Sequence, residues 1–92
     1  MPLEDFYAGD EGFHRFAQSF EAEWRQCADQ PRLLAAAGGD LDIAMVLHHH
    51  FGERVFDALA NKVPALENIT PAECLKTESG RRRLKEYLWR MP

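Results

Sequence analysis

Residues 41–51, LDIAMVLHHHF, limit the possible folds most, because their apolar side chains surround a helix on every side. Ile43 to Leu47 are five consecutive apolar residues. A helix that is apolar all round lies in the core of a protein or in a membrane, and this run is far shorter than the ~18 residues of a span. The sequence therefore predicts a central helix over residues 41–51, with Asp40 as its N-cap.

The segments before and after this helix also have helical periodicity, and none alternates as a β-strand does. A first helix is predicted from Asp10, as its N-cap, to about Ala28. Its apolar residues share one narrow arc: Phe13, Phe16, Ala17, Phe20, Trp24, Cys27 and Ala28. A short helix is predicted from Pro31 to Ala37, because proline suits the first turn and Gly38 and Gly39 would end it.

Further helices are predicted after the central one. Residues 53–61 form a short helix, and residues 62–69 form a connector. The sequence TPAE at Thr70–Glu73 is a typical helix start, in which Thr70 caps and Glu73 reaches back to the amide of Thr70. The final helix is predicted over residues 81–91, after a break at Thr77–Gly80.

A chain of 92 residues suits one small domain with a modest core. We expect an all-α, compact single domain of five or six short helices over residues 1–92. Residues 1–9 form a flexible N-terminal lead, residues 10–50 the N-terminal helices, and residues 51–92 a C-terminal region. The opening MPLEDFYAGDEG lacks the basic and apolar regions of a signal peptide, so we expect a cytoplasmic protein without a membrane partner.

Charge is distributed unevenly along the chain. The formal net charge is −4. Residues 1–60 carry eleven acidic against four basic residues, whereas residues 76–92 carry six basic against two acidic ones. An acidic body repels nucleic acid, which is therefore not favoured as a partner.

Residues with chemical potential do not form a catalytic pattern. His48, His49 and His50 diverge by about 100° per residue on a helix, so they cannot converge on one metal ion. His49 with Glu53 has usable spacing, but this pair is two ligands short of a site. Cys27 and Cys74 carry no nucleophile or zinc signature, and no glycine-rich phosphate loop is present. We expect no enzyme activity, no metal and no cofactor.

The final helix contains the candidate binding site. Leu84, Leu88 and Met91 share its apolar face, and a large aromatic, Trp89, falls on the opposite stripe with charged neighbours. An exposed tryptophan among cations is typical of an interface hot spot. The predicted partner-binding residues are Arg82, Lys85, Glu86, Trp89, Arg90, Met91 and Pro92.

Two alternatives to this site remain open. Trp89 would instead be a core residue if it packs on residues 1–9, where Leu3, Phe6 and Tyr7 also need cover. In that case the surface of His48 to His50 is the next candidate interface.

Residues 51–91 resemble the toxin-binding domain shared by MbcA, ParS and Xre-type antitoxins. That pattern runs from FG through a short helix ending in WL, a PN and ALGG connector, and TPxxLL to a final helix. The matching positions here are Phe51, Gly52, Leu59, Ala65, Leu66, Thr70, Pro71, Leu75, Thr77, Gly80, Leu84 and Leu88. Ala58 replaces the usual tryptophan, Lys62-Val63 replaces PN, and Glu67-Asn68 replaces the two glycines. Because glutamate adopts left-handed geometry poorly, we expect a connector of different shape.

The resemblance implies an inhibitor in a bacterial toxin–antitoxin system. Such antitoxins bind a RES-domain toxin that consumes NAD, and their C-terminal domain covers its active-site entrance. Many also carry an N-terminal helix-turn-helix, of which residues 10–50 would be a reduced form. The alternatives are another small acidic helical inhibitor or adaptor, for example phage-encoded, and a helix-turn-helix-like DNA-binding regulator. A homo-oligomer is also compatible with the sequence.

Overall fold

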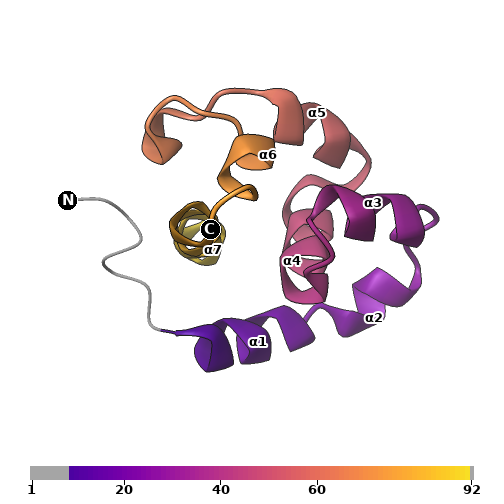
Figure 1. Ribbon diagram of the computed structural model, residues 1–92. Helices are drawn as coiled ribbons and strands as arrows, with labels where there is room; N and C mark the ends of the chain where they lie inside the picture. The colour runs from indigo at the N-terminus through magenta and orange to yellow at the C-terminus, as the bar shows by residue number, and fades with distance from the viewer. Residues whose placement is uncertain (1–8, 92) are drawn as a thin grey trace.

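Helix α4 (Leu41–Phe51) lies in the middle of the structure, with the other helices arranged round it (Figure 1). The computed structural model describes residues 9–91, so most of the predicted lead over residues 1–9 lies outside it. Ile43 to Leu47 are all buried. Asp40 caps α4 as predicted, because its carboxylate accepts a hydrogen bond from the Ile43 amide at 3.2 Å.

The chain is an all-α, compact single domain, as expected. Its Cα radius of gyration is 12.1 Å, and a globular chain of this length should have about 12 Å. The helices that precede α4 are α1 (Asp10–Gln18), α2 (Glu21–Arg25) and α3 (Gln30–Ala36). Those that follow are the 3₁₀ turn η2 (Gly52–Arg54), α5 (Val55–Ala60), the 3₁₀ turn η3 (Pro64–Leu66), α6 (Pro71–Cys74) and α7 (Glu78–Arg90).

The prediction of one continuous helix from Asp10 to Ala28 is wrong, since α1 ends at Gln18 and α2 begins at Glu21. The Ser19 hydroxyl donates to the Phe16 carbonyl at 2.6 Å, and the Ser19 amide bonds to the same oxygen at 3.2 Å. A serine that bonds back to its own helix competes with the regular ladder and favours a bend. The N-cap is Gly9, not Asp10, which is the first helical residue.

Two threonines begin the C-terminal helices. The Thr70 hydroxyl accepts the Glu73 amide at 3.1 Å, which confirms the predicted cap of α6. The Glu73 carboxylate lies 3.4 Å from the Thr70 hydroxyl, which donates to it. Helix α7 begins three residues earlier than predicted, because Thr77 caps it by accepting the Gly80 amide at 2.9 Å.

The connector between α5 and α6 adopts a geometry that we did not expect of it. Glu67 and Asn68 both have φ of 63°, in the left-handed region. A non-glycine residue there costs about 1–2 kcal/mol. Arg83 of α7 lies 3.0 Å from the Glu67 carboxylate and has a largely buried side chain, so this ion pair offsets part of the strain. An isolated bridge between Val63 and Ile69 closes the loop.

Gly80 sets the distance between α6 and α7. A Cβ added at this residue would overlap the carbonyl oxygen of Cys74 and lie 2.7 Å from the Thr77 hydroxyl. Gly80→Ala should therefore destabilise the domain by about 1–3 kcal/mol, as overpacking does. In an exposed helix the same change stabilises by about 1 kcal/mol, so the sign is diagnostic. Urea denaturation measures it.

Ser79→Ala is the matched control, because Ser79 is the exposed neighbour in the same helical turn. Its free energy of unfolding should change by no more than about 0.5 kcal/mol. A Gly80→Ala variant as stable as the wild type would show that α6 and α7 are not in close contact there.

Candidate partner-binding surface

Helix α7 contains most of the predicted binding residues, and Figure 1 shows it nearly along its axis, with α6, α4 and α1 around it. Leu84 and Leu88 are fully buried, as expected from the apolar face. The helix also contacts α1 on a further side. Much of the stripe that we predicted to face solvent is therefore covered.

Trp89 is not the exposed aromatic that we predicted. It is half-buried and packs on α1, where its ring stacks on Phe16 with centroids 5.9 Å apart and meets the edge of Phe13 at 6.0 Å. A Cβ added to Gly12 would lie 2.7 Å from the ring, so α1 needs glycine at this contact. The alternative packing on Leu3, Phe6 and Tyr7 falls outside the described residues.

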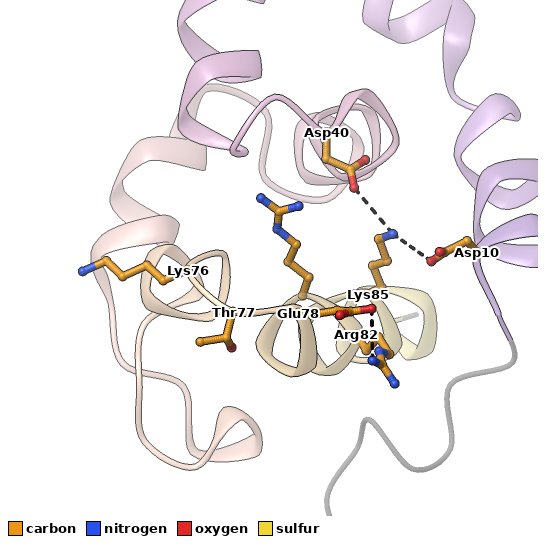
Figure 2. A pocket seen from close by; sticks show the side chains of 8 residues that line it. Asp10, Asp40, Lys76, Thr77, Glu78, Arg82 and Lys85 are labelled. Carbon is orange, nitrogen blue, oxygen red and sulfur yellow. Dashed lines mark hydrogen bonds and ion pairs between the residues drawn. The ribbon is translucent and has the colours of Figure 1, made fainter.

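Lys85 does not project into solvent, which contradicts our prediction. Its side chain connects α7 with two other helices. Its ammonium lies 3.0 Å from the Asp10 carboxylate of α1 and 3.5 Å from the Asp40 carboxylate that caps α4. It also lies 5.5 Å from the centre of the Phe13 ring. Its side chain is 11% exposed. Figure 2 shows Lys85 between the two acids. A lysine so placed stabilises the fold, because three elements meet at one charge.

Glu86 is also buried, with 6% of its surface exposed, which contradicts its predicted place on an open stripe. Its carboxylate accepts a hydrogen bond from the Arg90 guanidinium at 2.6 Å. Arg90 remains exposed, as expected, and Met91 is half-buried at the end of α7. Pro92 lies outside the described residues.

Arg82 keeps its predicted exposure. Its guanidinium lies 3.2 Å from the Glu78 carboxylate, and the two side chains are 48% and 85% exposed. An exposed pair of this kind contributes about 0.3–0.5 kcal/mol, so a binding partner can displace it at little cost. Arg82 and Arg90 are therefore the charged residues of the predicted set that are open to a partner.

A hollow of about 430 Å³ lies beside the start of α7 and was not foreseen from the sequence. Three carboxylates, of Asp10, Asp40 and Glu78, line it. Four cations also line it, namely Lys76, Arg81, Arg82 and Lys85. Figure 2 shows Lys76 and Arg82 pointing away from Lys85, so the four cations do not converge on one point. The hollow is therefore a mixed-charge surface.

Lys76 and Arg81 are the exposed cations that we missed. Within residues 9–91 neither has a carboxylate within 4.0 Å, whereas Arg82 and Arg83 each have one and Lys85 has two. The available signal was the run Arg81–Arg83 in the first turns of a helix, where the dipole disfavours cations. Such a run is less stable at the start of a helix than acidic residues would be.

The three consecutive histidines do not converge on one point: His48 and His49 contact α2 and its N-cap, and His50 contacts α7. His48 meets the edge of Trp24, and His49 stacks on Phe20 at 3.8 Å and lies 2.9 Å from the Glu23 carboxylate. His50 donates through Nε2 to the Leu88 carbonyl of α7 at 2.9 Å. No group of three or more His, Cys, Asp or Glu side chains in the described chain is placed to hold a metal ion.

No protein-family model, curated protein or solved structure matches the chain. Among residues 9–91, none of the helices has both the length and the apolarity that crossing a membrane requires. The resemblance of residues 51–91 to antitoxins stays a hypothesis based on the residues themselves.

Trp89→Ala should lower the free energy of unfolding by roughly 2–4 kcal/mol, because the ring is lost from the contact between α1 and α7. Thermal and urea denaturation measure this change. Arg82→Ala, on the exposed side of the same helix, is the control and should cost no more than about 0.5 kcal/mol. Equal stability of both variants would contradict the packing of Trp89.

His50 should make stability depend on pH. Burial lowers the pKa of His50 below its ordinary value of 6.5, His49 acts in the same direction, and the bond to the Leu88 carbonyl opposes both. The unfolded chain therefore binds a proton at His50 before the folded chain does. This contribution to stability is complete above about pH 6.5 and is lost as the pH falls through the lower, folded pKa.

Urea denaturation of wild type and His50→Gln at about pH 7 and about pH 5 measures this contribution. The glutamine amide can still donate to the Leu88 carbonyl but does not titrate. We expect the wild type to lose more stability on acidification than the variant. An equal loss in both proteins would show that His50 titrates no differently in the folded state.

Proposed function

We propose that this chain is an antitoxin-like protein that binds and inhibits a RES-type, NAD-consuming toxin through its C-terminal helical region, in the cytoplasm. The observation that carries the proposal is the connector. Glu67 and Asn68 are both left-handed, at the two positions where the antitoxin pattern has glycines. Left-handed geometry is the reason a pattern would call for glycine there.

Other matched positions support the proposal in the same way. Thr70 and Thr77 cap α6 and α7, and Gly80 allows the close approach of these helices. Each of these three residues therefore has a physical role in this chain. A fold with this left-handed turn and these two helices would need residues that cap the helices and allow them to approach closely.

The binding face that we propose differs from the one first predicted. Trp89, Lys85 and Glu86 contribute to the fold, so they are poor candidates for an interface. The exposed cations Lys76, Arg81, Arg82 and Arg90 remain. We place the binding face over the start of α7, where Lys76, Arg81 and Arg82 stand out from an otherwise acidic chain, whereas Arg90 lies at the far end of the helix.

The packing of α4 weighs against the DNA-binding alternative. In a helix-turn-helix formed by α3 and α4, α4 would enter the major groove. Five consecutive residues of α4 are buried, its N-cap is Asp40, and its first turn carries Asp42. The acidic start would be repelled by phosphates, and little of the surface of α4 is open to bases.

The acidic adaptor alternative rests on a different surface. Glu11, Glu21 and Glu23 of α1 and α2 are exposed. A partner that binds there would be basic, and its binding would not depend on α7.

An inhibition assay tests the proposal. The whole chain, mixed with a RES-domain toxin encoded beside it, should stop NAD consumption. Arg82→Glu should slow association several-fold at low salt and less at high salt, because charges at an interface rim steer the encounter. Stopped-flow binding and NAD consumption measure the two effects.

Arg25→Glu is the matched control. Arg25 also lies in an exposed i,i+4 pair, with Glu21 at 2.8 Å, but on α2. The Arg25→Glu substitution changes the net charge by the same amount as Arg82→Glu and should leave the association rate near that of the wild type. Failure of the chain to inhibit the toxin, or equal slowing by both variants, would refute the proposal.

A further inference from the structure

The Nε side of the Arg81 guanidinium is held in place by a hydrogen bond to the main chain. Its Nε donates to the Leu75 carbonyl at the end of α6, at 3.2 Å. Its Nη2 lies 3.4 Å from the position that a Cβ on Gly38 would take, so the group lies against the turn between α3 and α4. An arginine fixed in this way has already lost much of its side-chain freedom.

The terminal nitrogens of Arg81 have no hydrogen-bond partner among residues 9–91. A guanidinium offers five N–H donors in a rigid fork, and only the Nε donor is used. The free edge suits a carboxylate, which it can bind through two parallel hydrogen bonds.

Arg81 and Leu41 line a second hollow, of about 460 Å³. Leu41 is 46% exposed and is the exposed large hydrophobic side chain of the described chain. It begins α4 next to Asp40. A fixed cation and an exposed aliphatic side chain therefore face the same space.

The carboxylates of this hollow already have partners. Asp40 lies 3.5 Å from the Lys85 ammonium, and Asp42 lies 2.9 Å from Nδ1 of His14. They are not paired with Arg81, and they would repel a ligand with two negative charges more strongly than one with a single charge. The surroundings favour a ligand with a single charge.

We propose that Arg81 and Leu41 form a site for one carboxylate joined to an apolar group. This proposal rests on the proposed function and names the chemistry of the partner. The toxin would present an acidic side chain beside an aliphatic one to the start of α7 and the start of α4. A nucleic-acid phosphate fits less well, because the net charge of −4 repels a polyanion.

Titration with small carboxylates tests the site without the toxin. The probes are sodium acetate and sodium hexanoate, with sodium chloride at equal ionic strength as the blank. The backbone amides of Gly38, Gly39 and Leu41 and the Nε–H of Arg81 report binding by NMR. We expect saturable shifts at these groups, and hexanoate should bind several-fold more tightly than acetate because its chain covers Leu41.

Three variants separate the contribution of the Arg81 guanidinium to binding from that of the Leu41 side chain. Arg81→Gln should abolish the saturable shifts with both probes, and Leu41→Ser should make the two probes equal in affinity. Arg25→Gln, with the same loss of charge on α2 and outside the proposed binding face, should leave both affinities unchanged. Should Arg81→Gln fail to fold, Arg81→Lys keeps the charge without the fork and should weaken both probes several-fold.

Several results would overturn the inference. Shifts that never saturate, or that persist in Arg81→Gln, would show that Arg81 forms no site. Tighter binding of inorganic phosphate than of either carboxylate would point to a phosphate ligand instead. Because the toxin is absent from these titrations, their failure is distinct from a failure of the chain to inhibit the toxin.

Discussion

Burial of α4 is the constraint on which the rest of the structure depends. Ile43 to Leu47 leave the middle of this helix no face for solvent, so other helices must cover every side of that part. In a chain of 92 residues that cover comes from short helices. Three histidine contacts connect α4 with other helices. His14 of α1 contacts Asp42, and from α4 His49 contacts Glu23 of α2 and His50 contacts the Leu88 carbonyl of α7.

The crowding of helices in so short a chain also explains why the predicted exposed stripe of the final helix was partly wrong. A helical wheel identifies the apolar face of α7 but not the number of helices that contact it. Helix α7 packs against α4 and α6 and also against α1, so Trp89, Lys85 and Glu86 are covered although they lie off the apolar stripe. Lys85 illustrates the point, because its two acidic partners are 75 and 45 residues away in sequence. Such partners cannot be read from local spacing.

Local signals predicted the structure well where the physics is local. Asp40 and Thr70 cap the helices expected of them, since a cap depends on a side chain and an amide three residues apart. The break at Ser19 was missed because a serine hydroxyl can bond back in a continuous helix as well as at its end. The left-handed Glu67 was judged by propensity alone, whereas its geometry also depends on Arg83, which comes from another element.

The proposed binding face follows from this division of roles. Once Trp89 and Lys85 are assigned to the fold, the cations without local carboxylates, Lys76 and Arg81, and the weakly paired Arg82 remain at the start of α7. Amide hydrogen exchange of the whole chain, alone and bound to the toxin, tests this assignment most directly. We predict slower exchange on binding in residues 76–83 and in the turn at Gly38 and Gly39. Protection confined to α1 and α2, with unchanged exchange in α7, would contradict it.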